Sequence, residues 1–506
     1  MAEAPPGSAR VSQALAELDA VDLTGALRLR GSVVRVSDGV ADVVGLPDVA
    51  AEELVVFDGG ACGMAYDVAP EHTGVILLAG ADQVSAGQGV TATGTLPSLP
   101  AAPELLGRMI DPLGQPLDDL PAPVGQSRPI FHEAPALIER ASVDRPLHTG
   151  VLAIDAAIPI GRGQRQLILG DRNVGKTALA LDIVAAQRDS GVVCVYVVVG
   201  QPLSRVLAIR EALRDSGALA HTVVVAAEAA ETPAMQYLAP YAGTTIAECF
   251  RDGGRDALVV HDDLTKHADA YRELALLLGR PPGREAFPGD IFYIHGELLE
   301  RATAFNDEHG GGSVTAFPIV ETTDNDISTY IPTNLISITD GQIYLDTVRF
   351  ERNYRPAIDI GMSVSRIGGV AQPDSLRAAS KNLRIQVARF ESLETITRVG
   401  LDVDPRTARA LRKGRILREL LQQHRFQQRT VADEAIALTI TSQGWVDDLQ
   451  PKAAREVVWR TAELASEREP ELVASLEAGT PLNDAAVQSL KAVFDEAAAE
   501  VKETAP

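Results

Sequence analysis

Eight consecutive residues carry the clearest chemistry in this sequence. They match the pattern GxxxxGK[ST] and are Gly170, Asp171, Arg172, Asn173, Val174, Gly175, Lys176 and Thr177. The stretch follows the apolar run 166–169 and precedes the helix-forming run 178–187. Glycines let main-chain N–H groups close around an anion, and the N-terminus of a helix adds a favourable dipole. The sequence therefore predicts a phosphate site in which Lys176 reaches the outer phosphates and Thr177 binds magnesium. A chance glycine-rich turn is the weaker alternative.

A carboxylate suited to the same magnesium ion follows a second apolar run. Asp262 comes after the run 257–260, with His261 between, and Asp263 follows it. A carboxylate at the carboxyl end of a buried strand is typical of the second metal-binding element of such phosphate sites. The alternative is a helix cap or a turn residue.

The strand that follows the phosphate-site helix ends in an amide. The run 192–200 is apolar, and Gln201 comes directly after it. In one class of ring-shaped nucleotide motors a glutamate at this point orients the attacking water. A glutamine binds water but does not act as a carboxylate base. We therefore expect a nucleotide to be held here without being turned over.

The elements that must position these residues divide the chain into four regions. Residues 1–25 form a short arm, and 26–96 contain short strands, with a tight turn at Asp38-Gly39, that predict a small barrel or sandwich. Residues 97–372 alternate apolar runs with helical segments, which is typical of a parallel sheet covered by helices. Residues 373–506 are helical throughout, and Leu383, Val387 and Phe390 share one helix face. We expect a helical bundle there.

Composition excludes several classes of protein. The 506 residues carry 46 Lys+Arg and 69 Asp+Glu, a net charge of −23, which argues against nucleic acid as the main partner. Cys62, Cys194 and Cys249 are isolated, so we expect neither a disulfide framework nor a cysteine-rich zinc site. We see neither a signal peptide nor a run of apolar residues long enough to span a membrane.

Longer motifs give the chain a family resemblance. GDRNVGKT, the stretch HDDLTKHADAYRELALLLGRPPGREAFPGDIFY, STYIPTNLISITDGQIYLD and RPAIDIGMSVSRIGG closely resemble the alpha subunits of F-type ATP synthases. The resemblance covers well over four fifths of the chain. It implies a multidomain protein with a small N-terminal β-barrel, a central P-loop (RecA-like) α/β nucleotide-binding domain and a C-terminal α-helical bundle.

The resemblance also assigns roles to single residues. Arg366 matches the family's arginine finger, which reaches the phosphates of a neighbouring catalytic site; from the sequence alone it would read as an interface salt bridge. Phe350, Arg355 and Gln423 match positions around the nucleotide of the subunit's own site, where packing is the alternative. Glu321 belongs to the same family pattern with no chemistry assigned.

The implied function is that of a regulatory, mostly non-catalytic subunit. Such a subunit binds ATP or ADP with Mg²⁺, alternates with a catalytic beta-type subunit in a hexamer around a gamma-type shaft, and meets a peripheral stalk. The complex makes or hydrolyses ATP coupled to proton or sodium transport. It sits on the cytoplasmic face of a bacterial inner membrane, so the membrane association of this chain would be indirect.

Two departures and two alternatives qualify this expectation. Arg425 stands where the family usually has a second glutamine, and Pro202-Leu203 follow Gln201 where the family has basic residues. Both put the nucleotide affinity in question. The alternatives are an autonomous catalytic ring ATPase of the secretion or helicase type, and a scaffold that has lost nucleotide binding.

Overall fold

The computed structural model describes residues 30–397 and 404–504. The arm expected at 1–25 lies outside the described residues. The described chain forms two compact units. One contains the residues up to Pro97 together with 232–234 and 273–280, and the other contains the rest.

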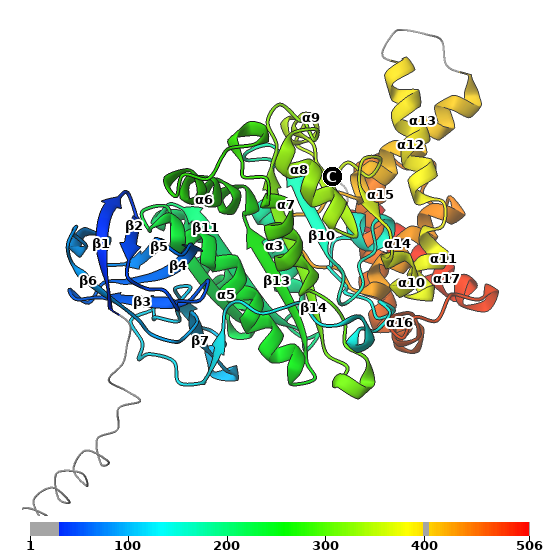
Figure 1. The fold of residues 1–506 in the computed structure, drawn as a ribbon. Coiled ribbons are helices and arrows are strands. Elements are labelled where there is room, and N and C mark those ends of the chain that lie inside the picture. The colour runs from blue at the N-terminus through cyan, green and yellow to red at the C-terminus, as the bar shows by residue number, and fades with distance from the viewer. Residues whose placement is uncertain (1–29, 398–403, 505–506) are drawn as a thin grey trace, which may run out of the picture. The chain divides into compact units, whose positions relative to one another are not determined.

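The first unit is built on a closed six-stranded barrel in the order β1-β2-β5-β4-β3-β6 (Figure 1). Its strands are β1 (Arg30–Ser37), β2 (Val40–Val44), β3 (Leu54–Phe57), β4 (Cys62–Val68), β5 (Thr73–Ala79) and β6 (Gly89–Ala92). Asp38 and Gly39 join β1 to β2 with φ values of 33° and 90°, as a two-residue hairpin turn requires. Val33, Val43, Val55 and Phe57 fill the interior. Of the two expected architectures, the barrel is the one that forms.

The second unit contains an eight-stranded sheet in the order β16-β15-β10-β14-β13-β11-β12-β8. These strands are β16 (Val364–Ser365), β15 (Gly341–Leu345), β10 (Gln166–Gly170), β14 (Ser313–Glu321), β13 (Asp256–Asp262), β11 (Val193–Gln201), β12 (Thr222–Glu228) and β8 (Met109–Ile110). All pairs are parallel except β15 with β16. Residues 193–199 of β11 are all buried, as both faces of a covered parallel sheet require. A separate pair of strands is formed by β7 (Ser98–Ala101) and β9 (Gln126–Pro129).

Helices accompany the sheet along the chain. They are α2 (Leu152–Ala157), α3 (Lys176–Ala186), α4 (Leu203–Asp215), α5 (Pro233–Asp252), α6 (Leu264–Leu277), α7 (Ile291–Glu300), α8 (Tyr330–Ile338), α9 (Thr347–Glu351) and α10 (Gly368–Ala371). Because β10, β11, β13 and β14 are parallel, their carboxyl ends meet at one edge of the sheet. That edge therefore collects Gly170, Gln201, Asp262 and Glu321, and ligands of open α/β sheets bind at such an edge.

The C-terminal region is a helical bundle, as expected. Its helices are α11 (Asp374–Ser380), α12 (Leu383–Thr397), α13 (Pro405–Leu420), α14 (Val431–Gln443), α15 (Pro451–Arg468), α16 (Pro470–Glu477) and α17 (Asp484–Thr504). Thr430 and Asp433 form a capping box at the start of α14, which supplies partners to the otherwise unpaired N–H groups of its first turn. Leu383 and Phe390 of α12 are buried. The apolar core of the bundle continues into that of α2, α3 and the central sheet.

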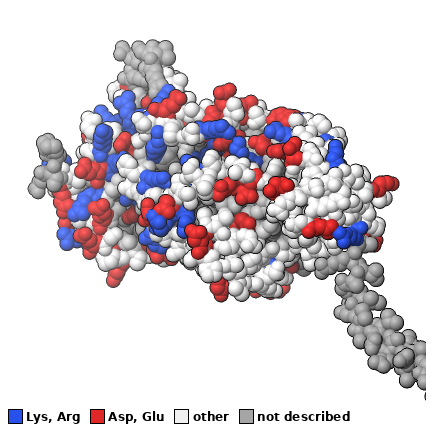
Figure 2. Space-filling model, turned by 90° about the vertical axis from the view of Figure 1, so that its left-hand side faces the viewer, with Lys and Arg blue, Asp and Glu red and all other residues white. Residues whose placement is uncertain are grey.

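Charged side chains of both signs are distributed over the surface that Figure 2 shows. Acidic and basic side chains are interspersed on the face drawn in Figure 2, so the net charge of −23 forms no continuous acidic patch on that face. Within residues 30–397 and 404–504, no helix combines the length and the apolar character needed to cross a bilayer.

Candidate nucleotide-binding site

The loop between β10 and α3 has the backbone that an anion site needs. Gly175 has a φ of 103°, which residues with a side chain rarely adopt. A Cβ on Gly170 would lie 2.5 Å from the carbonyl oxygen of Leu345, so only glycine fits where β10 passes β15. The predicted strand, glycine-rich loop and helix therefore form in that order.

The side chain of Lys176, near the end of this loop, bonds the backbone of the loop itself. Lys176 is 7% exposed, and its Nζ donates to the carbonyl oxygens of Gly170 (2.8 Å) and Asp171 (2.7 Å). Burial lowers the pKa of Lys176. Phosphate oxygens can replace these two carbonyls as acceptors of the Lys176 ammonium.

The side chain of Asp171 stabilises the loop from outside the cavity. Its carboxylate accepts hydrogen bonds from Thr322 Oγ1 (2.6 Å), from the backbone N of Asn325 (2.9 Å) and from Thr347 Oγ1 (3.2 Å). These bonds fasten the loop to the segments after β14 and β15. The side chain of Asp171 thus braces the loop, whereas residues 172–177 line the cavity.

The predicted magnesium ligands lie side by side. Thr177 Oγ1 donates to Asp262 Oδ2 over 2.8 Å, and the hydroxyl of Tyr196 donates to the same oxygen over 2.9 Å. Burial raises the pKa of Asp262. Burial and the charge of Asp262 together raise the pKa of Asp263 to about 7. Two adjacent buried carboxyl groups beside a hydroxyl form an oxygen-rich corner, which fits Mg²⁺.

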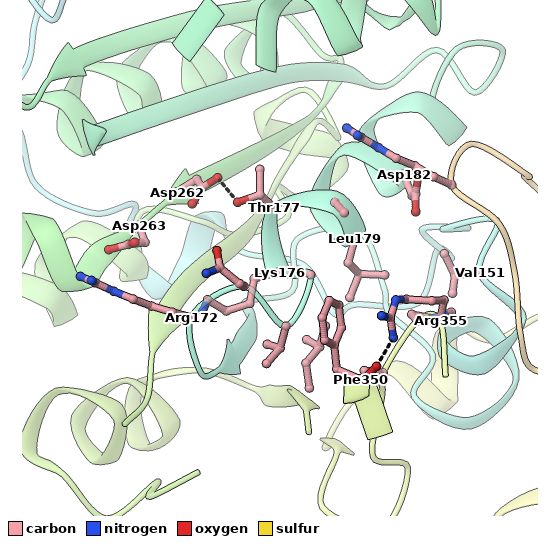
Figure 3. Close-up of a pocket in the computed structure, with 18 of the residues that line it drawn as sticks. Val151, Arg172, Lys176, Thr177, Leu179, Asp182, Asp262, Asp263, Phe350 and Arg355 are labelled. Carbon is pink, nitrogen blue, oxygen red and sulfur yellow. Dashed lines mark hydrogen bonds between the residues drawn. The ribbon is translucent and has the colours of Figure 1, made fainter. Parts of the chain in front are cut away.

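The cavity above the loop has a volume of about 870 Å³. Figure 3 shows its two ends, with Asp262, Asp263 and Arg172 on one side of Lys176, and Phe350 and Arg355 on the other. The Arg355 guanidinium lies 3.6 Å from the centre of the Phe350 ring and donates to the carbonyl oxygen of Phe350 over 2.5 Å. An arginine held over an aromatic ring gives this end a wall suited to stacking of a base.

At the charged end, Arg172 has a partner within the chain. Its Nε donates to Glu321 over 2.9 Å, and its side chain is 69% exposed. The pair lies at the mouth of the cavity. Gln201 lines the same cavity at the end of β11.

Gln423 lines the cavity, but its amide is already fully used. Its Oε1 accepts from the backbone N of Leu152 (2.7 Å), and its Nε2 donates to the carbonyl oxygens of Gly150 and Gln427 (2.8 Å each). Within the described residues, these bonds tie the end of α13 to the cavity wall 149–151 and use the side-chain oxygen and both amide protons. Gln423 therefore lines the cavity with an amide that already bonds its own chain.

Two lining residues, Arg205 and Asp182, and the buried Tyr196 beside them escaped the sequence reasoning. Tyr196 on β11 fixes Asp262, and Arg205 on α4 lines the charged end. Asp182 on α3 accepts from the backbone N of Phe426 over 2.9 Å, and burial raises its pKa to about 6. The signal for Asp182 was present, because it is the only charged residue in the run 177–187.

Arg366 lies outside this cavity. It is exposed just after β16, and its two terminal nitrogens donate to the carbonyl oxygens of Thr339 and Ile336 at 3.3 Å each. Its backbone N donates to the carbonyl oxygen of Asp340 over 2.9 Å. The main chain at Arg366 is thus fixed beside β15, and its guanidinium bonds the carbonyls at the end of α8.

Comparison with known proteins follows the same division of the chain. Family models of the ATP synthase alpha/beta family match residues 28–94 (beta-barrel domain), 150–365 (nucleotide-binding domain) and 372–497 (C-terminal domain). The chain belongs to the ATP synthase alpha/beta family. The ATP synthase subunit alpha of Caldanaerobacter subterraneus subsp. tengcongensis is 44% identical over 465 residues, which cover 92% of each chain. These matches confirm the predicted resemblance to alpha subunits and the predicted three-part architecture.

The family assignment agrees with the geometry of the cavity. The match to the family's nucleotide-binding domain begins at Gly150, on the cavity wall, and ends at Ser365, directly before Arg366. The loop, the carboxylate of Asp262 and the aromatic wall at Phe350 all fall within it.

Proposed function

We propose that this chain is the regulatory alpha-type subunit of a rotary F-type ATP synthase. It holds Mg-ATP or Mg-ADP in its own cavity without turnover and supplies Arg366 to a neighbouring catalytic site. The observation that carries this proposal is the amide of Gln201 at the phosphate end of the cavity.

The chemistry at that end supports holding rather than hydrolysis. An amide does not accept the proton of an attacking water. The carboxylates nearby are engaged, since Asp262 accepts from Thr177 and Tyr196, and Glu321 pairs with Arg172. Asp263 is buried and accepts from the backbone N of Lys266 over 2.8 Å.

The residues that would hold the nucleotide have separate tasks. Lys176 and the backbone N–H groups of the loop receive the phosphates, and Thr177 and Asp262 hold Mg²⁺. When bound, Mg²⁺ neutralises phosphate charge next to two buried carboxyl groups. Phe350 and Arg355 receive the base against the plane of their stacked side chains.

The exposed guanidinium of Arg366 supports the second half of the proposal. Phosphoryl transfer spreads negative charge over the phosphate oxygens, and an arginine supplied in trans raises turnover by about 10³–10⁵. Arg366 meets the requirements of such a group because its backbone is fixed at the sheet edge and its side chain is exposed and does not line the chain's own cavity.

The partners follow from this role. We propose a beta-type catalytic subunit as the neighbour in an alternating hexamer, a gamma-type central shaft and a peripheral stalk. The complex would couple ATP synthesis or hydrolysis to proton or sodium transport at the cytoplasmic face of a bacterial inner membrane. The chain itself would be peripheral.

Reconstitution tests the proposal. The purified full-length chain should bind Mg-ATP at equilibrium and hydrolyse it no faster than the Lys176→Gln variant does. Adding a beta-type partner should produce turnover that depends on Arg366. Vigorous hydrolysis by the chain alone would instead favour an autonomous ring ATPase, and no binding at millimolar Mg-ATP would favour a scaffold.

A further inference from the structure

A second group of potential metal ligands lies behind the cavity wall. His148 precedes the wall residue Thr149, Asp155 lies on α2, and Glu434 lies on α14 of the helical bundle. One potential ligand atom from each residue lies within 4.8 Å of the other two. We call these three residues the His148 cluster.

The distances within the His148 cluster fit a shared ion. His148 Nε2 lies 3.3 Å from Asp155 Oδ2 and 3.5 Å from Glu434 Oε2. Nitrogen and oxygen ligands about 2.0–2.2 Å from a tetrahedral zinc ion lie about 3.3–3.5 Å from one another. The same separations are long for direct hydrogen bonds.

The cluster also contains an unsatisfied buried carboxyl group. Glu434 is 0% exposed, and among the described residues neither of its side-chain oxygens has a hydrogen-bond partner; His148 Nε2, at 3.5 Å, is its nearby ionic partner. His148 Nε2, which faces both carboxylates, also lacks a hydrogen-bond partner among these residues. Asp155 is 3% exposed and accepts from the backbone N and the hydroxyl of Thr149. Buried polar groups left without partners are costly, so an unfilled role for this glutamate requires an explanation.

We propose that His148, Asp155 and Glu434 bind one zinc-class transition-metal ion. An imidazole with two carboxylates is a ligand set that suits Zn²⁺ and its neighbours, whereas Mg²⁺ prefers oxygen ligands and retains several waters. A divalent ion would balance the charges of the two carboxylates beside a neutral imidazole. The side chain of His148 is 28% exposed, which gives the ion a path of entry.

The position of the site suggests what the ion does. Asp155 holds Thr149, and residues 149–151 line the nucleotide cavity. Glu434 belongs to the first turns of α14. A bound ion would link the cavity wall at residues 149–151 to helix α14 of the bundle. This link would be separate from the hydrogen bonds of Gln423. It would be a structural ion, distinct from the Mg²⁺ held by Thr177 and Asp262.

Titration of the full-length chain tests the site. Protein freed of metal by a chelator is titrated with ZnCl₂ in excess Mg²⁺ and followed by calorimetry. We expect one Zn²⁺ per chain and a rise in the melting temperature. Co²⁺ should give the intense visible absorption of a four-coordinate site, a readout that needs no variant.

Variants identify the ligands. Glu434→Gln and His148→Gln should weaken Zn²⁺ binding by more than about 100-fold, since even the outer partners of metal ligands contribute 10–100-fold. His72→Gln controls for binding at an exposed histidine. Glu477→Gln controls for general attraction by a nearby acid, and both controls should leave the affinity unchanged. Circular dichroism checks that each variant is folded. Absence of saturable Zn²⁺ binding by the folded wild type, or an unchanged affinity in Glu434→Gln, would overturn the proposal.

Discussion

The hydroxyl of Thr177 donates to the carboxylate of Asp262 over 2.8 Å, which joins the first turn of α3 to the last residue of β13. The two groups are far apart in sequence and meet because their strands are parallel members of one sheet. A hydroxyl and a carboxylate held this close would supply two of the six oxygen ligands of a magnesium ion.

Thr177→Ala removes the hydroxyl oxygen that we expect to bind magnesium. We expect Mg-ADP to bind at least about tenfold more weakly, a loss of about 1.4 kcal/mol, while ADP in EDTA binds as it does to the wild type. Calorimetric titrations with and without Mg²⁺ measure the difference. Thr177→Ser keeps the oxygen and should restore the magnesium dependence. An equal loss in EDTA would mean that Thr177 supports the loop rather than the ion.

Arg366→Lys tests the finger in the assembled complex. The planar guanidinium presents paired donors that an ammonium does not reproduce. Turnover should fall by about 10³-fold or more, while nucleotide binding at the chain's own cavity stays within error. The matched control is Arg377→Lys, another exposed arginine that donates to a backbone carbonyl, that of Gly369. Near-normal turnover of the Arg366→Lys complex would remove the finger assignment.

Gln423→Leu separates two roles for one residue. The substitution leaves the N–H of Leu152 without its side-chain partner, and a buried donor left unpaired costs about 1–3 kcal/mol. We expect the free energy of unfolding to fall by that amount in urea titrations without nucleotide. Gln422→Leu is the control, because among the described residues the side chain of Gln422 donates only to Glu419 (3.3 Å). Unchanged stability with weaker nucleotide binding would favour direct contact with the base.

Asp182 gives the chain a specific dependence on pH. Burial raises its pKa to about 6 from the usual 3.8, so the folded state holds this proton more tightly than the unfolded state does. Its contribution to stability is full below about pH 4 and is lost as pH rises through 6. Asp182→Asn should therefore gain stability relative to the wild type between pH 4 and 7.

Unfolding midpoints across that range measure the effect. Asp189→Asn, at an exposed position just after α3, serves as the control and should track the wild type. A constant offset between Asp182→Asn and the wild type at every pH would contradict the assignment.

The parts of the site that sequence reasoning predicted are those with local signatures. The loop that ends in Lys176 and Thr177 lies between a strand and a helix, and a continuous apolar run predicted the burial of β13 before Asp262. Each of these features depends on the order of neighbouring residues, so each can be recognised from the sequence alone. The strand pattern left a barrel and a sandwich open, since closure depends on pairing β1 with β6, which the intervening sequence does not specify; the family resemblance predicted the barrel.

The remaining parts depend on partners distant in sequence. The bonds of Gln423 reach Gly150 and Leu152, so its sequence position could not reveal that its amide was occupied. Tyr196 reads as one more apolar residue of β11 until Asp262 is placed beside it. Glu434 is an ordinary acid in the first turn of α14 until α2 brings Asp155 to it.

The apolar core that α3 shares with the C-terminal helices has a practical consequence. A fragment ended before α11 would lose the helices α11 and α12 that pack against α2, and would present that side of the shared core to water. Such a truncation should give insoluble material rather than a minimal nucleotide-binding module. The nucleotide domain and the bundle should also melt as one cooperative block, so calorimetry should not resolve a separate transition for the helices.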